Sequence, residues 1–498
     1  MSRYCWVRRQ CGGIAMTDDR LSVTRRRYLL GLGAGAIATT GVGAPASAQT
    51  TTAGEYLWSL EASGYIYGSP TVVDGTVYVG SYDSNLYALD AEIGEKQWAL
   101  DMGGRVYSSP TVVDGTVYIG SLDDNLYAVD AETGEKQWAF QTNNDVYSSP
   151  TVVDGTVYVG SGEKDDNGNL YAVDAGTGEK QWAFQTGDGV RSSPTVVDGT
   201  VYVGSNDTNL YAVDAGTGEK QWAFQTGDGV RSSPTVIDGT VYVGSNDTNL
   251  YAVDAGTGEK QWAFQTGDSV ESSPTVIDGT VYVGSYDDNL YAVDAATGEK
   301  QWTFQTRDLG TSSPTVVDGT VYVGSGSSDG GNLYAVDAAT GEKQWAFKTS
   351  GSVSSSPTVV DGTVYVGSAF YVGDNNGELY AVDAGVEGSS EDSRVMLGTL
   401  GHHGGWSYAD QSISMGGTAD PKGDTSPSDE TSSTERPSTA GGSDGQNDDN
   451  EESGLTDGRS GPGFGVGSAL AALGTASSYA GYRQLSGDDA DQPMDDGD

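Results

Sequence analysis

One fourteen-residue stretch recurs almost unchanged along most of this chain. Ser-Ser-Pro-Thr-Val-Val-Asp-Gly-Thr-Val-Tyr-Val-Gly-Ser begins, with minor variation, at Ser108, Ser148, Ser192, Ser232, Ser272, Ser312 and Ser355, and a looser copy begins at Gly68. Successive copies of its proline are 40 residues apart, except for one interval of 44 and one of 43. A period near 40 residues with strand-like content is typical of propeller arrays, in which each repeat packs only against its neighbours.

Each repeat contains four short segments with strand character. Pro-Thr-Val-Val is rich in β-branched residues, and the Asp-Gly that follows, as in Asp114-Gly115, predicts a two-residue hairpin turn. The alternating Thr-Val-Tyr-Val-Gly-Ser is a second strand, and a polar Ser-x-Asp-x-Asn loop leads to a third, Leu-Tyr-Ala-Val-Asp. A Thr-Gly turn then leads to Lys-Gln-Trp-Ala-Phe-Gln-Thr. With no helical periodicity in residues 55–385, each repeat is predicted to form a four-stranded antiparallel blade.

The tryptophans predict how the array closes. Seven of them follow the third strand of a repeat: Trp98, Trp138, Trp182, Trp222, Trp262, Trp302 and Trp345. The eighth repeat ends at Asp383 without one, whereas Trp58 stands alone before the first repeat. We therefore expect the strand around Trp58 to complete the last blade. A closed ring removes the open sheet edges. The fold class is then all-β, an eight-bladed propeller over residues 55–385.

The third and fourth strands carry a recognisable motif. Residues 128–138, Ala-Val-Asp-Ala-Glu-Thr-Gly-Glu-Lys-Gln-Trp, resemble the tryptophan-docking motif A-x-D-x-x-T-G-x-x-x-W of the pyrroloquinoline-quinone-type β-propeller repeat, and the motif recurs in seven units. This family includes quinoprotein alcohol dehydrogenases, the bacterial outer-membrane assembly-factor scaffold and secreted archaeal repeat proteins. The resemblance implies that each tryptophan stacks between neighbouring blades, as a structural residue.

The resemblance also raises the possibility of a quinone cofactor, which the sequence does not favour. The family's dehydrogenases use an adjacent disulfide-bonded cysteine pair, a Ca²⁺ ion and a catalytic Asp, whereas Cys5 and Cys11 are the only cysteines here and no unique acidic residue stands out from the repeats. We expect no catalytic residues, no cofactor and no metal. Three weaker alternatives stay open: quinone-dependent dehydrogenation, a metal site at His402-His403, and Ca²⁺ at loops 163–169 or 374–378.

One variable position suggests a binding face. Three residues before each repeated proline the chain has, in order, Tyr67, Tyr107, Tyr147, Arg191, Arg231, Glu271, Thr311 and Ser354. In an antiparallel blade this connector shares a face with the loop between strands two and three. In this family the first strand lines the central channel. We therefore expect these side chains to ring one channel mouth, on the face that carries the longer loops 162–169, 326–332 and 369–378. Tyr and Arg are enriched at binding hot spots; drift among young duplicates is the alternative.

The N-terminal segment has the pattern of an export signal. In residues 24–48, Arg25 and Arg26 belong to a Thr-Arg-Arg-Arg-Tyr-Leu stretch that resembles the twin-arginine signal. An apolar run and a small-residue cleavage pattern at Ala46 and Ala48 follow. Residues 1–48 are therefore expected to be removed on export, and residues 1–15 precede a plausible second start. An uncleaved membrane anchor is the alternative.

The C-terminal segments differ in composition from the repeats. After a short post-propeller segment, 386–415, residues 416–460 are rich in Gly, Ser, Thr and acidic residues, which predicts a disordered stalk. Residues 461–498 contain Pro462-Gly463-Phe464 and a diluted apolar run, and they resemble an archaeal surface-anchoring tail that is cut and joined to a lipid. The acidic end departs from that pattern, so a free acidic tail stays open. We expect localisation at the cell surface or outside the cell.

The charge balance limits the possible partners. The chain has 70 acidic and 25 basic residues, for a formal net charge of −45. Such a surface repels nucleic acids and anionic membranes, so contact with a membrane is expected only through the C-terminal anchor. The Asp-rich, Lys-poor composition is typical of proteins from salt-loving archaea. We expect a monomeric, non-catalytic module that binds a protein, peptide or glycan; a purely structural envelope component is a further alternative.

Overall fold

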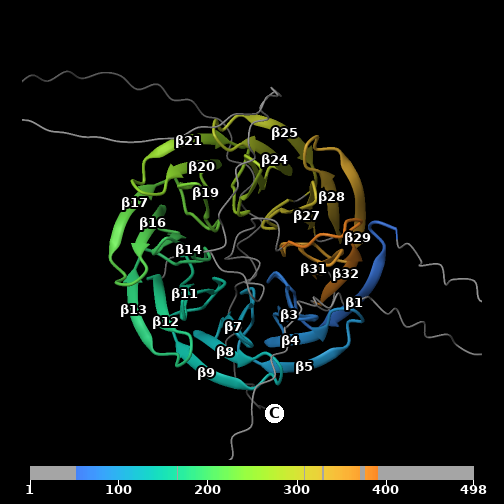
Figure 1. The fold of residues 1–498 in the computed structure, drawn as a ribbon, viewed down its shortest axis with the longest axis horizontal. Coiled ribbons are helices and arrows are strands. Elements are labelled where there is room, and N and C mark those ends of the chain that lie inside the picture. The colour runs from blue at the N-terminus through green and yellow to red at the C-terminus, as the bar shows by residue number, and fades with distance from the viewer. Residues whose placement is uncertain (1–51, 165–166, 308, 328–329, 371–375, 391–498) are drawn as a thin grey trace, which may run out of the picture. The chain divides into compact units, whose positions relative to one another are not determined.

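Eight four-stranded antiparallel sheets form a closed ring (Figure 1). A computed structural model describes residues 52–164, 167–307, 309–327, 330–370 and 376–390. The predicted all-β, eight-bladed propeller is confirmed. The described residues contain no helix that is long and apolar enough to cross a membrane. Residues 1–51 and 391–498, which hold the predicted signal, stalk and anchor, lie outside the described ranges.

The strands follow the order predicted for each repeat. The first strands are β2 (Thr71–Val73), β6 (Thr111–Val113), β10 (Thr151–Val153), β14 (Thr195–Val197), β18 (Thr235–Ile237), β22 (Thr275–Ile277), β26 (Thr315–Val317) and β30 (Thr358–Val360). The second strands are β3 (Thr76–Gly80), β7 (Thr116–Ser121), β11 (Thr156–Ser161), β15 (Thr200–Gly204), β19 (Thr240–Gly244), β23 (Thr280–Ser285), β27 (Thr320–Ser327) and β31 (Thr363–Ala369).

The third and fourth strands lie farther from the channel, and Figure 1 shows the fourth strands at the rim. The third strands are β4 (Asn85–Asp90), β8 (Asn125–Asp130), β12 (Asn169–Asp174), β16 (Asn209–Asp214), β20 (Asn249–Asp254), β24 (Asn289–Asp294), β28 (Gly330–Asp337) and β32 (Gly377–Asp383). The fourth strands are β5 (Lys96–Asp101), β9 (Lys136–Gln141), β13 (Lys180–Gln185), β17 (Lys220–Gln225), β21 (Lys260–Gln265), β25 (Lys300–Gln305), β29 (Lys343–Thr349) and β1 (Tyr56–Ala62). Blades 1 to 8 are numbered by their first strands, β2 to β30.

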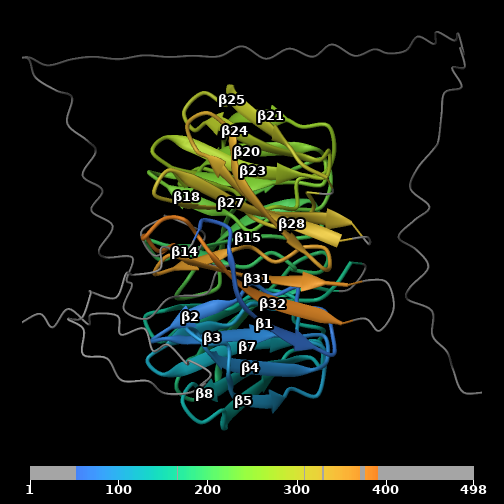
Figure 2. The same ribbon diagram turned by 90° about the vertical axis from the view of Figure 1, so that its right-hand side faces the viewer.

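The last blade is composite, as the position of Trp58 predicted. Its sheet has the order β1-β32-β31-β30, and β1 pairs antiparallel with β32 through partners such as Leu60 and Leu379. Gly54 completes the Thr-Gly turn that this blade lacks. Its N–H donates to the carbonyl of Asp383 at 2.8 Å, as Gly134 does to Asp130 within blade 2. In Figure 2, β1 lies beside β32 although most of the chain separates them.

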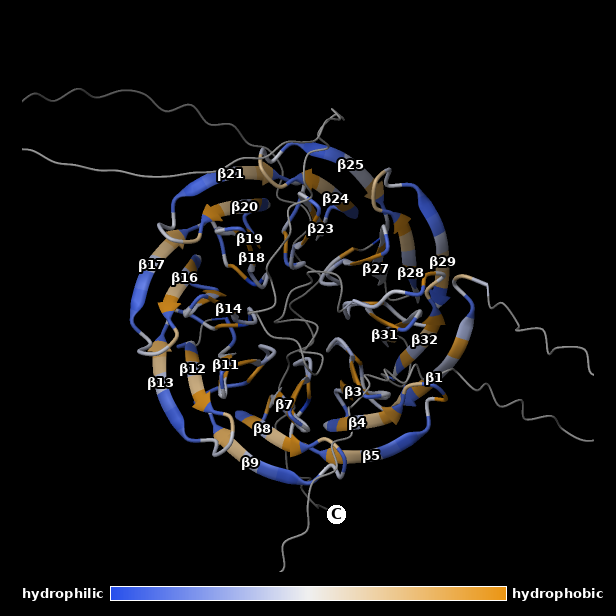
Figure 3. Ribbon diagram, viewed as in Figure 1, coloured by the Kyte–Doolittle hydropathy of each residue, from blue (hydrophilic) through white to orange (hydrophobic). Residues whose placement is uncertain are grey.

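The core consists of eight apolar layers between neighbouring blades. Tyr78 and Leu86 of blade 1, for example, pack with Val117 and Ile119 of blade 2 in one buried cluster. The second and third strands are almost entirely buried, whereas most fourth strands alternate between exposed and half-buried positions. Figure 3 shows the polar ends of these outer strands at the rim. Each blade therefore buries its two faces against its neighbours, which is why the fold must close.

The tryptophans dock between the blades. Each Nε1–H of Trp58, Trp98, Trp138, Trp182, Trp222, Trp262 and Trp302 donates to the carbonyl of an alanine in the next blade, at 2.9–3.1 Å. Each of these rings also lies against the turn glycine of that blade, as Trp98 does against Gly134. Trp345 lies instead against Gly54, so the composite turn provides the same surface. Each indole therefore packs against the turn of a neighbouring blade.

Two closed rings of hydrogen bonds surround the channel. The backbone N–H of one serine per blade donates to the Oγ of the equivalent serine in the next, at 2.8–3.0 Å, from Ser69 round to Ser356 and back. One threonine hydroxyl per blade donates to the carbonyl of the next repeated proline, at 2.5–2.6 Å. Both rings include the step from blade 8 to blade 1. These contacts explain why Ser-Pro-Thr is repeated in every blade.

Candidate functional site

The eight variable residues lie around one mouth of the central channel. Together with the eight ring serines they line a cavity of about 110 Å³: Tyr67, Tyr107, Tyr147, Arg191, Arg231, Glu271, Thr311 and Ser354. All eight are half-buried. Each stands in the connector that enters the first strand of its blade, so the fold places one such residue at every step of the ring. We call this set the mouth ring.

Tyrosines occupy one side of the mouth ring. The rings of Tyr67 and Tyr107 stack with centroids 5.1 Å apart and an interplanar angle of 23°, and Tyr107 meets Tyr147 edge-on at 5.5 Å. Tyr65 and Tyr82 extend this cluster, with Tyr82 4.9 Å from Tyr67. Burial raises the pKa of Tyr82 and Tyr147 above the ordinary value. Both of these phenols therefore stay neutral at physiological pH.

Arg191 contacts the tyrosine cluster, and both arginines of the mouth ring form ion pairs. The guanidinium of Arg191 lies 4.4 Å from the ring centroid of Tyr147 and 5.6 Å from that of Tyr107, within the distance of a cation–π contact. It also lies 3.6 Å from Glu163. Arg231 Nη1 is 2.9 Å from Glu271 Oε1. The mouth thus combines aromatic faces with two arginines whose charges are partly compensated.

The sequence did not single out several residues that complete this surface. Arg231 Nε donates to Asn206 Oδ1 at 3.1 Å, Tyr286 contacts Glu271, and Arg105 lies over the ring of Tyr82 at 5.5 Å. Tyr82, Asn206 and Tyr286 share one signal, since each is the second residue of a Ser-x-Asp-x-Asn loop. Glu163 had no such signal because it stands in the inserted loop of blade 3, whose sequence differs from the longer loops of blades 7 and 8.

Thr311 and Ser354 form the remaining part of the mouth ring. The hydroxyl of Thr311 donates to the carbonyl of Ser354 at 3.1 Å. This part has small uncharged side chains, whereas the neighbouring blades 1 and 2 carry the stacked Tyr67 and Tyr107. The asymmetry is confined to the mouth, because the serine and threonine rings below it run unbroken through all eight blades.

A family model for the outer membrane protein assembly factor BamB matches residues 20–107, 98–222, 166–277, 206–327 and 307–389, which together span most of the chain. The chain belongs to the BamB-like propeller family. No curated protein matches it.

Solved structures of several kinds share this BamB-like fold. BamB from Moraxella catarrhalis is 21% identical, with a TM-score of 0.54 over 65% of this chain and 96% of that one. The quinohemoprotein alcohol dehydrogenase ADHIIG from Pseudomonas putida HK5 is also 21% identical, with a TM-score of 0.55 over 66% and 76%. The computationally designed Ika8 protein is 16% identical, with a TM-score of 0.57 over 66% and 99%. At these identities the likeness shows the fold alone.

Most of the other predicted sites lie wholly or partly outside the described residues. Among the described residues, no three His, Cys, Asp or Glu side chains are grouped so that they could hold a metal ion. His402 and His403 lie outside the described ranges, and so does part of each loop considered for Ca²⁺. Arg25, Arg26, Ala46, Ala48 and the anchor motif Pro462-Gly463-Phe464 also lie outside them. Export and anchoring therefore stay predictions.

Proposed function

We propose that this BamB-like propeller is an exported, non-catalytic module that binds a partner protein or peptide at the mouth ring. The observation that carries the proposal is the asymmetry of that ring. A framework repeated in every blade places stacked tyrosines and arginines on one side and small side chains on the other. Tyr and Arg are enriched at binding hot spots, and Tyr provides a large contact area with only two rotatable side-chain bonds. The proposed export rests on the sequence signal.

The chemistry of the mouth suggests what kind of segment it would bind. A cluster of neutral phenol rings favours planar or apolar side chains, such as those of aromatic residues and proline. Aromatic-lined grooves recognise proline-rich segments in other domains. Arg191 could also meet a carboxylate of the partner, because the side chain of Glu163 beside it is 48% exposed and can turn away. A glycan is the second ligand class that such a surface could accept.

The residues at the channel do not fit the quinone site of the family's dehydrogenases. The cavity at the mouth ring has a volume of about 110 Å³. Its lining has no cysteine and a single carboxylate, Glu271, which is already paired with Arg231. This supports a non-catalytic module over a quinone-dependent oxidoreductase. Dye-linked alcohol oxidation by the purified protein after addition of the quinone would contradict the proposal.

The test compares two double variants of the full-length protein. Tyr107→Ala with Arg191→Ala removes the centre of the aromatic side. Thr311→Ala with Ser354→Ala changes two residues of the same ring on its polar side and serves as the matched control. Each protein is immobilised in high salt and exposed to its native envelope fraction, and bound proteins are quantified by mass spectrometry.

The expected result is a partner that the native protein and the control retain equally. The Tyr107→Ala/Arg191→Ala variant should lose it by at least tenfold, since hot-spot truncations cost roughly 2 kcal/mol or more. Equal retention by all three proteins would place binding elsewhere. Retention of no partner by any of them would favour the purely structural role in the envelope. Circular dichroism of the three proteins checks that the fold is the same.

A further inference from the structure

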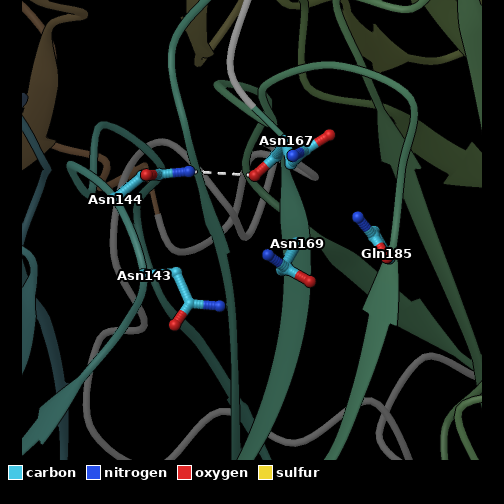
Figure 4. A pocket seen from close by; sticks show the side chains of 5 residues that line it. All are labelled: Asn143, Asn144, Asn167, Asn169 and Gln185. Carbon is cyan, nitrogen blue, oxygen red and sulfur yellow. Dashed lines mark hydrogen bonds between the residues drawn. The ribbon is translucent and has the colours of Figure 1, made fainter.

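Five carboxamide side chains line a second pocket on the face of the mouth ring. Asn143 and Asn144 come from the connector between β9 and β10, Asn167 and Asn169 from the start of β12, and Gln185 from the end of β13. The pocket has a volume of about 340 Å³. Figure 4 shows Asn143 and Asn144 on one side of this space and Asn169 and Gln185 on the other. We call it the amide pocket.

One hydrogen bond fixes the two loops that shape the amide pocket. Asn144 Nδ2 donates to the carbonyl oxygen of Asn167 at 2.9 Å, drawn as the dashed line in Figure 4. This contact joins the connector that leaves blade 2 to the inserted loop of blade 3. The same inserted loop carries Glu163, which lies 3.6 Å from Arg191 of the mouth ring. The two sites are thus neighbours on one face but have different lining residues.

Comparison with the other blades shows that this pocket lacks the usual carboxylates. The position of Asn167 holds aspartate in blades 1, 2, 4, 5 and 6, as in Asp207, and the position of Asn144 holds aspartate in blades 4 to 6, as in Asp188. In blade 4, Asp207 Oδ2 accepts from the N–H of Gly187 at 2.7 Å and from the hydroxyl of Tyr211 at 2.8 Å. The carboxylate of a standard blade is therefore engaged within the protein.

The change from carboxylate to amide alters what the pocket can recognise. In blade 4 the amide of Asn209 donates to both the carbonyl and the carboxylate of Asp207. In blade 3 the equivalent of Asp207 is Asn167, which carries an amide instead of a carboxylate. Each carboxamide presents two donor hydrogens and an acceptor oxygen, whereas an ionised carboxylate only accepts. The lining thus offers both kinds of hydrogen-bonding group and no formal charge.

These properties narrow the class of ligand. Neither an anion nor a cation would find an opposite charge among the lining residues, and the net charge of −45 disfavours anions over the whole surface. An apolar ligand would leave the amides without partners, which is costly. A nucleobase is usually bound by stacking on an aromatic or guanidinium plane, and no such side chain lines the pocket. A neutral sugar, whose hydroxyls both donate and accept, matches the lining.

We propose that the amide pocket is a binding site for a neutral carbohydrate. A volume of about 340 Å³ is at the lower end of the range of about 300–1,000 Å³ for small-molecule pockets, which suits a short saccharide rather than a long chain. The three amides that distinguish blade 3 from blades 4 to 6, Asn143, Asn144 and Asn167, select the ligand. This site does not depend on the function proposed for the mouth ring.

The experiment uses the full-length protein and defined sugars. Maltose, cellobiose and N,N′-diacetylchitobiose are the neutral probes, and glucuronate is the charged comparison. Saturation-transfer NMR detects contact, and titration gives the dissociation constant of the sugar that binds best. The test variant, Asn143→Gly with Asn167→Asp, gives blade 3 the residues that blades 4 to 6 already have. It is therefore compatible with the fold, and its new carboxylate should be engaged by the backbone and Tyr171.

The native protein should bind at least one neutral disaccharide and not glucuronate. The Asn143→Gly/Asn167→Asp variant should bind that sugar at least tenfold more weakly, which corresponds to about 1.4 kcal/mol. The Tyr107→Ala/Arg191→Ala variant should bind it as the native protein does, so a failed mouth ring and a failed amide pocket are distinguishable. Equal binding by the blade 3 variant, binding of glucuronate as strong as that of the neutral sugars, or no contact with any sugar would overturn the proposal.

Discussion

At the scale of single residues, the packing of neighbouring blades depends on close contact between an indole and a glycine. A Cβ built on Gly258 would lie 2.8 Å from the indole Cδ2 of Trp222, closer than real Cβ contacts allow. Gly258 also has a φ of +74°, a region that residues with a Cβ seldom adopt. Two separate demands therefore select glycine at this turn.

These two demands can be separated experimentally. Gly239, in the Asp-Gly hairpin of the same blade, has the same φ of +74°, but a Cβ there would meet nothing within 4 Å. Gly239→Ala should cost only the backbone strain, roughly 1–2 kcal/mol. Gly258→Ala should cost a further amount of about 1–3 kcal/mol because the indole must shift. Urea unfolding of both variants measures the difference, and equal destabilisation would show that the indole contact does not matter.

A threonine in the turn between the third and fourth strands stabilises the ionised carboxylate of an aspartate. In blade 2 both the backbone N–H and the hydroxyl of Thr133 donate to Asp130 Oδ1 at 2.8 Å, and these bonds lower the pKa of that carboxyl. In blade 1 the equivalent residue is Ile93, which is 56% exposed and can offer only its backbone N–H to Asp90. Blade 1 therefore has a weaker version of the turn.

We expect Ile93→Thr to raise the melting temperature and Thr133→Ile to lower it. A carboxyl whose pKa is lowered by folding adds stability above its unfolded pKa and loses it as the pH falls through the folded value. The deficit of Thr133→Ile should thus be present at neutral pH and shrink as the pH falls below the ordinary Asp value of 3.8. Thermal melts at several pH values test this, and a deficit that is unchanged in acid would argue for a packing effect instead.

At the scale of elements, β1 differs from every other outer strand. A short turn, Ile93-Gly94 in blade 1 and Thr-Gly in the rest, joins each of the others to the third strand of its own blade, whereas β1 pairs with β32 from the opposite end of the repeat region. Trp58 is its anchor: the side chain is buried, and its Nε1 donates to the carbonyl of Ala91 in blade 1 at 3.0 Å. The seam between blades 8 and 1 therefore depends on one strand without a hairpin.

Trp58→Ala should open this seam selectively. Truncating a large aromatic residue in a core costs roughly 3–5 kcal/mol, and here the strand that loses it has no turn to hold it in place. Backbone amides of β1 and β32 should exchange hydrogen faster than those of the other blades. Trp222→Ala, which removes the equivalent residue from a continuous blade, is the matched control. Uniform exchange across all blades in the Trp58→Ala variant would show that the ring opens as a whole.

The repeats made these elements predictable. The features that could not be predicted from the sequence lie in particular loops. Eight copies aligned on one another gave the four strands, the Asp-Gly and Thr-Gly turns, and the completion of the last blade by Trp58. The amide pocket was not predicted from the sequence. Asn167 replaces the aspartate of other blades, but the insertion in this loop obscured which residues are equivalent. The ion pair between Arg191 and Glu163 could not be predicted from the sequence. Glu163 lies in an insertion, so no equivalent residue in a standard blade indicates its position.

At the scale of the whole molecule, the charge distribution opposes the fold at low salt. Against a net charge of −45, the described residues contain two ion pairs, Arg191 with Glu163 and Arg231 with Glu271. Arg231 and Glu271 are half-buried, and salt screens a partly buried pair much less than exposed charges. Screening these two attractive pairs therefore costs little, whereas screening the repulsion among the excess carboxylates removes an unfavourable term spread over the surface.

The melting temperature should consequently rise between 0.1 and 2 M KCl. The distance over which charges interact falls from about 10 Å at 0.1 M to about 3 Å at 1 M, which is shorter than most spacings between surface carboxylates. A variant in which several exposed fourth-strand glutamines, such as Gln97, Gln137 and Gln181, are changed to lysine should depend less on salt because its net charge is lower. Preferential exclusion of the salt would instead stabilise both proteins equally. Parallel slopes of melting temperature against salt for the two proteins would thus contradict the electrostatic explanation, and a smaller slope for the lysine variant would support it.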